Sequence, residues 1–150
     1  MASAFALADA EGRRHRLADY RGRWLLLYFY PRDFTPGCTL EACALRDAWP
    51  ALGAAVLGVS LDPPARHRRF ARRLGLPFPL LCDDGTVAAA YGALWRLGPW
   101  RLTRRRSFLI DPEGHIARVY GRPHPRRHGR GVAEDLARFT RRASPPSGSR

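Results

Sequence analysis

With 150 residues, the chain is long enough for one domain with a hydrophobic core, and its 45% apolar content is typical of a globular protein. The first thirty residues contain no apolar segment of the kind found in secretory signals, and the longest apolar run, residues 24–30, is too short to cross a bilayer. We therefore expect a cytoplasmic protein with no membrane partner.

The net charge of +13 is carried by arginine alone, because the sequence contains no lysine. A basic surface can bind nucleic acid through phosphate contacts. A GC-rich coding source would produce the same arginine-rich composition without any such partner. We expect no nucleic-acid partner, and a non-catalytic basic binding module remains an alternative function.

The first predicted elements are two short strands within residues 5–20, separated by a turn at Glu11 and Gly12. The apolar run of residues 24–30 is typical of a strand that is buried on both faces. Good helix formers follow from Cys38, and this predicted helix should end near Pro50.

The rest of the chain continues this alternation. We predict a strand over 54–61, a helix over 63–75, a strand over 78–83 and a helix over 85–91, then a hairpin of strands 106–111 and 115–120 and a helix over 132–142. Strands that alternate with helices indicate an α/β fold with parallel strands and right-handed crossovers. One domain should cover residues 1–140, and the Pro- and Ser-rich residues 141–150 should form a disordered basic tail.

The chain has three cysteines, an odd number, and a protein of this size does not need disulfides for stability in a reducing compartment. Cys38 and Cys43 form a CxxxxC pair, and Cys82 is isolated in sequence. This spacing matches neither a CxxC redox pair nor the paired CxxC motifs of a zinc site. The sequence therefore does not favour a zinc site, and the surroundings of each thiol must indicate its role.

Cys38 lies at the start of a predicted helix. Thr35 is a favoured N-cap residue and Pro36 is favoured directly after a cap, which makes Cys38 the third helical residue. The unpaired backbone N–H groups and the positive end of the helix dipole favour a thiolate over a neutral thiol at this position. The sequence therefore predicts an attacking thiolate at Cys38.

Cys43 lies five residues further along the same helix, which corresponds to about 7.5 Å of rise. A disulfide requires Cα atoms within about 7 Å and converging side chains. If Cys38 and Cys43 react with each other, residues 36–46 must therefore unwind locally. Core packing is the alternative role for Cys43, and Cys82 is an alternative partner for Cys38.

The segment YPRDFTPGCTLEAC resembles the active-site segment of the peroxiredoxins, and its CxxxxC spacing resembles the bacterioferritin comigratory protein or peroxiredoxin Q subfamily. The resemblance continues in GVSLD, LPFPLLCDDGTVAAAYG and RRRSFLIDPEGHI. It implies a thioredoxin-like fold with a mixed central sheet flanked by helices. It also implies that Cys38 is the peroxidatic cysteine, that Cys43 is the resolving cysteine, and that Pro31 and Thr35 complete the peroxide pocket.

The same resemblance implies an arginine just before the SFLID strand that holds the thiolate and polarises the peroxide. Arg105 matches this position, and strand alternation places Arg104 and Arg106 on the opposite face. Glu41 matches a position that could orient Arg105, although an exposed helix carboxylate is an alternative. The region between Cys43 and GVS is shorter than the family pattern and contains Pro50, which suggests a shortened or loosened helix.

By this resemblance the protein is a thiol peroxidase that reduces hydrogen peroxide and organic hydroperoxides. Cys43 would resolve the Cys38 sulfenic acid as an intramolecular disulfide, and thioredoxin or a glutaredoxin-type dithiol would reduce it. A one-cysteine peroxidase resolved by an external thiol is an alternative. The resemblance implies no metal and no organic cofactor, and it favours a monomer.

Overall fold

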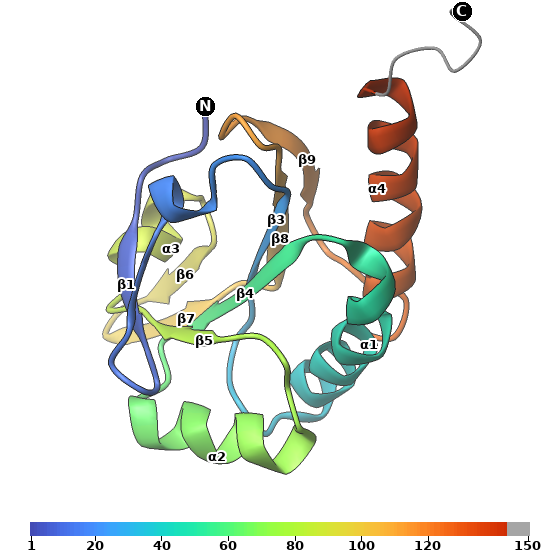
Figure 1. The fold of residues 1–150 in the computed structure, drawn as a ribbon. Coiled ribbons are helices and arrows are strands. Elements are labelled where there is room, and N and C mark those ends of the chain that lie inside the picture. The colour runs from blue at the N-terminus through green and yellow to red at the C-terminus, as the bar shows by residue number, and fades with distance from the viewer. Residues whose placement is uncertain (144–150) are drawn as a thin grey trace, which may run out of the picture.

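The computed structural model describes residues 1–143. Seven strands form one mixed sheet in the order β2-β1-β5-β4-β3-β8-β9, and a separate hairpin is formed by β6 and β7 (Figure 1). The strands are β1 (Ala6–Asp9), β2 (Arg14–Arg16), β3 (Leu25–Phe29), β4 (Ala55–Ser60), β5 (Leu80–Cys82), β6 (Leu94–Leu97), β7 (Trp100–Thr103), β8 (Arg106–Ile110) and β9 (Ile116–Tyr120).

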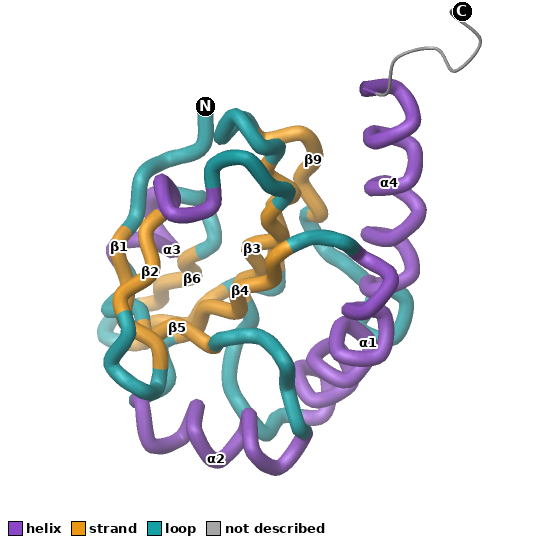
Figure 2. The backbone as a smooth tube through the Cα atoms, viewed as in Figure 1, coloured by secondary structure: helices purple, strands orange, loops and turns teal. Residues whose placement is uncertain are grey.

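Helices cover both faces of this sheet. They are α1 (Pro36–Leu52), α2 (Pro64–Leu74), α3 (Thr86–Ala90) and α4 (His128–Ala143), with a 3-10 helix at Leu17–Tyr20. Helices α1, α2 and α4 pack on one face, whereas α3 and the N-terminal segment pack on the other (Figures 1 and 2). The predicted mixed sheet flanked by helices is confirmed.

The central strand β3 is buried along its whole length, as predicted. Leu25, Leu27 and Phe29 enter one core, and the alternate residues Leu26 and Tyr28 enter the other. Strand β3 pairs in parallel with β4 and antiparallel with β8. This pairing brings the residue before β8 to the end of β3 where α1 begins.

Three boundaries differ from the sequence predictions. Helix α1 continues past Pro50 to Leu52 and ends at Gly53, whose φ of 62° is the left-handed conformation that glycine adopts readily. Helix α4 begins at His128 instead of residue 132 and runs to Ala143, so it includes the first residues of the predicted tail. The remainder of that tail lies outside the described residues.

The β6–β7 hairpin was not predicted. Its turn contains Gly98, with a φ of 58°, followed by Pro99. The strands are not hydrogen-bonded to the main sheet. One face of the hairpin is exposed and nevertheless apolar. The sequence LWRLGPWRLT therefore lacks the alternation of buried apolar and exposed polar residues that would identify its strands.

Candidate active site

The loop before α1 positions the first turn of the helix. Thr35 occupies the N-cap position in an extended conformation, Pro36 is the first helical residue, and Cys38 is the third. The side-chain cap expected from Thr35 is not formed: its hydroxyl donates a hydrogen bond of 2.8 Å to the Arg32 carbonyl. The backbone N–H groups of the first turn are therefore not blocked by the Thr35 side chain.

Cys38 is a free thiol with only 1% of its surface exposed. Arg105 lies in the two-residue link between β7 and β8, and its Nη2 donates to Cys38 Sγ at 3.3 Å. Its Nη1 donates to Glu41 Oε1 at 2.7 Å. We call Cys38, Glu41 and Arg105 the thiol cluster.

Gly37 leaves room for this arginine. A Cβ atom at residue 37 would lie 2.9 Å from Arg105 Nη2, which is closer than real contacts allow. The guanidinium is also bound to Glu41, so a side chain at residue 37 would have to displace it against this ion pair. The glycine in the TPGC sequence is thus part of the geometry that brings Arg105 to the sulfur.

Glu41 is completely buried one turn after Cys38. The exposed-carboxylate alternative for Glu41 is therefore wrong. Burial raises the pKa of Glu41 to about 7, although the charge and hydrogen bond of Arg105 act in the opposite direction. Its second oxygen, Oε2, has no hydrogen-bond partner among the described residues. Glu41 thus carries an incompletely satisfied buried carboxylate next to the reactive sulfur.

His128, at the start of α4, is close enough to Arg105 to be affected by its charge and was not predicted from the sequence. It is buried, and its Nε2 is 2.7 Å from Ser107 Oγ. Burial, together with the positive charge of Arg105, lowers the pKa of His128 to about 4. The ring is therefore neutral at physiological pH and adds no second positive charge beside the arginine.

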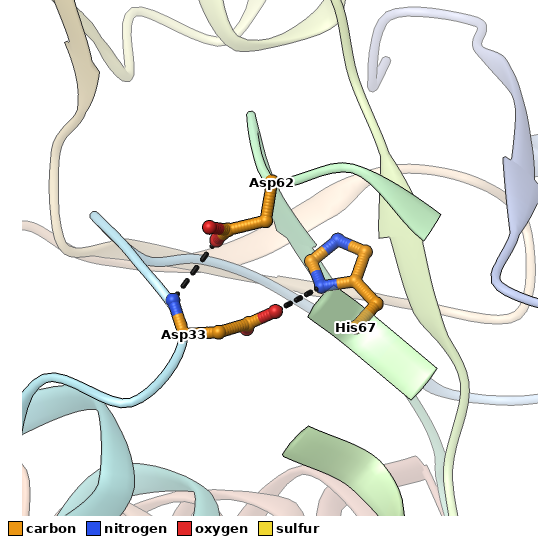
Figure 3. Close-up of side chains that lie close together, drawn as sticks. All are labelled: Asp33, Asp62 and His67. Atoms are coloured by element: carbon orange, nitrogen blue, oxygen red, sulfur yellow. Dashed lines mark hydrogen bonds and ion pairs between the residues drawn. The ribbon is translucent and has the colours of Figure 1, made fainter. Parts of the chain in front are cut away.

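A second buried group of ionisable residues lies on the other side of the same loop. His67 of α2 is 2.6 Å from Asp33 through Nδ1, and the Asp33 backbone N–H donates to Asp62 at 2.9 Å (Figure 3). We call Asp33, Asp62 and His67 the loop cluster. No local sequence pattern predicts this cluster, because its members come from separate segments of the chain.

The loop cluster is closely satisfied. The two Asp33 oxygens accept from Tyr30 and His67, and His67 Nε2 lies 3.0 Å from the Leu81 carbonyl. Although burial opposes the charged ring, the hydrogen bond with Asp33, assisted by Cys82, raises the pKa of His67 to about 9. The cluster could geometrically hold a metal ion, but its oxygen and nitrogen atoms already bind one another or the neighbouring Ser60 and Arg66, so we assign it a structural role.

This network secures a strained segment. Phe34 has a φ of 68°, which is the left-handed region and is unusual for an aromatic residue. Its neighbour Asp33 is held by the loop cluster, and the Arg66 guanidinium donates to the Asp33 carbonyl at 2.9 Å. The loop cluster therefore fixes the backbone that leads into Thr35 and Cys38.

The other two cysteines lie apart from the thiol cluster. Cys43 is half-buried on α1, and both Cys38 and Cys43 are free. Cys82 is the last residue of β5 and interacts with His67 of the loop cluster. The structure thus brings Cys38, Arg105 and Glu41 together but does not bring either remaining thiol to Cys38.

The second half of α1 is firmly anchored. Gly129 of α4 packs so closely on it that a Cβ at residue 129 would lie 2.5 Å from the Ala44 carbonyl oxygen and 2.9 Å from Ala48 Cβ. Arg46 donates a hydrogen bond of 2.7 Å to the Leu74 carbonyl at the end of α2. Close contacts to two other helices therefore hold the part of α1 that follows Cys43.

A pocket of about 780 Å³ opens beside Arg105. Pro31 forms part of its wall, together with residues of the β6–β7 hairpin and of the segment after β9.

No helix in the described part of the chain is both long and apolar enough to span a membrane.

Comparisons with known proteins agree with this geometry. Residues 1–119 match the model of the AhpC/TSA family. A Coxiella burnetii relative that bears the name peroxiredoxin bcp is 44% identical over 79% of this chain and 84% of its own length. The crystal structure of peroxidoxin BcpB from Mycobacterium tuberculosis superposes with a TM-score of 0.85 at 31% identity, covering 91% of this chain and 94% of that one.

A Xanthomonas campestris bacterioferritin comigratory protein, whose structures address alkyl peroxide reduction, superposes with a TM-score of 0.84 at 29% identity and covers 90% of this chain and 91% of that one. These neighbours confirm the predicted thioredoxin-like fold and the predicted resemblance.

Proposed function

Because the chain belongs to the AhpC/TSA family and is a thiol peroxidase of the peroxiredoxin class, we propose that Cys38 is the sulfur that attacks the hydroperoxide. The single observation that carries this assignment is the hydrogen bond from Arg105 to Cys38 Sγ at the start of α1. An arginine that donates to a sulfur at a helix N-terminus stabilises its anionic, nucleophilic form.

In the first step, the Cys38 thiolate attacks the terminal oxygen of ROOH. A sulfur–oxygen bond forms and the oxygen–oxygen bond breaks, so the sulfur is oxidised to a sulfenic acid while the peroxide is reduced. The transferred oxygen keeps its hydrogen in the sulfenic acid, and the leaving alkoxide takes up a proton from solvent, equivalent to the one that Cys38 released on ionising, so the product is ROH. The guanidinium of Arg105 stabilises the negative charge as it moves from sulfur to the leaving oxygen.

Thr35 and Pro31 have supporting roles in this proposal. Since the Thr35 hydroxyl donates its hydrogen to Arg32, its oxygen is left to accept a hydrogen bond from the peroxide O–H. Pro31 lines the pocket beside Arg105 and offers an apolar surface to the substrate. Hydrogen peroxide and organic hydroperoxides are the proposed substrates.

In the second step, the Cys43 thiol displaces water from the Cys38 sulfenic acid and forms a disulfide. Both cysteines lie on the intact helix α1, so the first turns of α1 must unwind before the sulfur atoms can meet. An external dithiol, thioredoxin or a glutaredoxin-type protein, would then reduce the disulfide by exchange.

Intact mass spectrometry tests both steps on the reduced protein after one equivalent of hydrogen peroxide. We expect the mass to fall by that of two hydrogens, with a peptide map that joins Cys38 to Cys43. Cys38→Ser should abolish the change, and Cys43→Ser should accumulate an oxygen adduct on Cys38. An unchanged mass in the wild-type protein would contradict the proposed role of Cys38.

The same experiment separates the alternatives. An oxygen adduct that persists on wild-type Cys38 would indicate a one-cysteine peroxidase, and a peptide that joins Cys38 to Cys82 would identify Cys82 as the resolving thiol. A basic binding module would leave peroxide unconsumed and bind DNA with an affinity that falls steeply with salt. We further propose that the protein is cytoplasmic and monomeric. Light scattering of the purified protein would test whether it is a monomer.

A further inference from the structure

The outer end of the β6–β7 hairpin exposes large apolar side chains. Cross-strand pairing places Trp95 opposite Leu102 and Leu97 opposite Trp100, with all four on one face. The two residues beside the turn are the most open, since Leu97 is 62% exposed and Trp100 is 71% exposed. Exposed apolar patches often mark a surface that binds a partner. We call residues 97–100 the hairpin tip.

The hairpin tip does not hold the hairpin on the domain. That attachment comes from the other end of the two strands, where Leu94 packs against the core and Thr103 is buried. At the turn, a Cβ atom on Gly98 would meet no atom of the described residues within 4 Å. The lining of the pocket beside Arg105 does not include the hairpin tip. The tip is therefore open to solvent and separate from the candidate active site.

The part of the chain that contains the hairpin is strongly basic. Residues 85–110 include five arginines and no aspartate or glutamate. Among residues 1–143, Arg105 is the only one of these five that forms a salt bridge with a carboxylate. Arg106 donates to a neutral backbone carbonyl, and Arg96 and Arg104 are exposed. An anionic surface therefore complements the charge around the hairpin tip.

A second copy of the chain fits this surface poorly. Two copies joined at the hairpin would bring their arginines together, and the like charges would repel each other. The four apolar side chains expose on the order of 400–500 Å² in total, which is about half of what each partner contributes to a stable protein interface. A membrane contact needs less area, because it combines a small apolar insertion with a basic patch.

We propose that the hairpin tip binds the surface of anionic lipid membranes. Leu97 and Trp100 enter the boundary between headgroups and acyl chains, where tryptophan is enriched in membrane proteins. The arginines of the hairpin attract the negatively charged headgroups. The expectation of no membrane partner rests on the lack of a segment that could cross the bilayer, and a peripheral contact needs no such segment. The inference does not depend on the proposed function.

Co-sedimentation with lipid vesicles tests the proposal in the absence of peroxide and reductant. Vesicles of phosphatidylcholine and phosphatidylglycerol in a three-to-one ratio are compared with vesicles of phosphatidylcholine alone. We expect the protein to bind the anionic vesicles at least about tenfold more tightly in 0.1 M salt, because each arginine near an anionic surface contributes about fivefold. This preference should shrink in 0.5 M salt, since salt screens the charges.

Variants separate insertion of the hairpin tip from attraction by the net charge. Trp100→Ser should weaken binding to the anionic vesicles about tenfold, and the double variant with Leu97→Ser should weaken it further. Trp49→Ser is the matched control, because Trp49 is 38% exposed on α1, outside the hairpin. Arg96→Gln should weaken binding about fivefold. Arg141→Gln, in the last turn of α4 and away from β6 and β7 (Figure 1), should change it less than about twofold.

A spectroscopic measurement reports the insertion directly. Brominated acyl chains in the anionic vesicles should quench the tryptophan fluorescence of the wild type more than that of Trp100→Phe, a variant that keeps an aromatic ring at the hairpin tip. Equal quenching of the two proteins would show that Trp100 does not enter the bilayer and would overturn the proposal.

Other outcomes of the vesicle assay would also overturn it. Equal binding of Trp100→Ser and Trp49→Ser would show attraction by net charge alone, and equal binding of the wild type to both kinds of vesicle would exclude the charge selection. Dimers of the wild type but not of Trp100→Ser in light scattering, without vesicle binding, would identify a second copy as the partner. Trp100→Ser should reduce hydrogen peroxide at the wild-type rate, because the hairpin tip lies outside the candidate active site.

Discussion

The loop cluster and the thiol cluster flank the same short segment, residues 31–37, yet they are built differently. In the loop cluster, both Asp33 oxygens and both His67 ring nitrogens have partners. In the thiol cluster, Glu41 Oε2 has no partner and Arg105 remains 20% exposed. The loop cluster only holds the backbone, whereas the charged groups of the thiol cluster must also interact with a substrate.

This contrast has a physical reason. A buried ion pair stabilises a structure only when its charges are well satisfied, since desolvation of each ion is costly. The thiol cluster tolerates a less favourable arrangement because Arg105 divides its donors between a carboxylate and a sulfur. We therefore expect damage to the loop cluster to be measured mainly as lost stability, and damage to the thiol cluster mainly as lost rate.

The largest expected effect is on the loop cluster. Asp33→Ala leaves the buried His67 without its counterion, and the free energy of unfolding should fall by about 3–5 kcal/mol. Urea unfolding monitored by circular dichroism measures it. Asp47→Ala is the control, because its pair with Arg46 is exposed and should contribute less than about 1 kcal/mol. Equal losses in both variants would remove the distinction between the clusters.

Arg105→Ala should lower the reaction rate much more than the stability of the fold. Loss of a preorganised donor to the developing negative charge should lower kcat/KM for hydrogen peroxide by about 100-fold to 1,000-fold. Arg105→Lys keeps the charge but not the two-pronged geometry, so it should recover only part of the rate. Peroxide consumption with a dithiol reductant measures both. A rate within twofold of the wild type in Arg105→Ala would exclude Arg105 from the reaction.

The free energy of unfolding should depend on pH in a different pH range for each cluster. The pKa of His67 is raised from 6.5 to about 9, so its contribution is complete below pH 6.5 and is lost as the pH rises through 9. The pKa of Glu41 is raised from 4.5 to about 7, so its ionisation lowers stability between these two values.

Glu41→Gln should remove the lower of these two windows. Relative to the wild type, its free energy of unfolding should rise by about 1–3 kcal/mol between pH 4.5 and pH 7, and remain constant above that. Denaturant titrations at a series of pH values provide the comparison. A difference that is independent of pH would show that Glu41 does not titrate in this range.

The smallest expected effect comes from Gly37→Ala. The added methyl group displaces the guanidinium of Arg105 without changing any charge, and we expect kcat/KM to fall about tenfold. Gly131→Ala is a suitable control, because a Cβ at residue 131 of α4 would meet no atom within 4 Å. Crystal structures of the Gly37 variant would show whether Arg105 has moved away from Cys38.

The features that local sequence patterns determine were predicted well. The apolar run that became β3, and the turn that places Cys38 at the third position of a helix, need only a few neighbouring residues. Arg105 could be distinguished from Arg104 and Arg106 by strand alternation, and among residues 1–143 only Arg105 donates to Cys38. The resemblance to peroxiredoxins supplied the roles that these positions would have.

Features that depend on distant contacts were missed. Asp33 meets His67 only because β4 and α2 bring residue 67 back to the loop, and Glu41 pairs with Arg105 only because the link between β7 and β8 lies beside α1. Helix α4 starts before its amphipathic pattern begins. Gly129, in its first turn, contacts α1 closely, but glycine is a poor helix former and does not predict a helix there. The β6–β7 hairpin carries apolar residues on its exposed face, so its pattern does not resemble that of a half-buried strand.

The close contact of Gly129 with Ala44 and Ala48 divides α1 into two parts that should open independently. Backbone amides up to Cys43 are not restrained by α4 in this way, so they should exchange with deuterium through a local opening of low free energy. Amides after Ala44 should exchange only when the whole domain unfolds, so the local opening should be shorter than the residues 36–46 expected from the sequence. Cys43, which must move to reach Cys38, would then be the last residue before the rigid part of the helix.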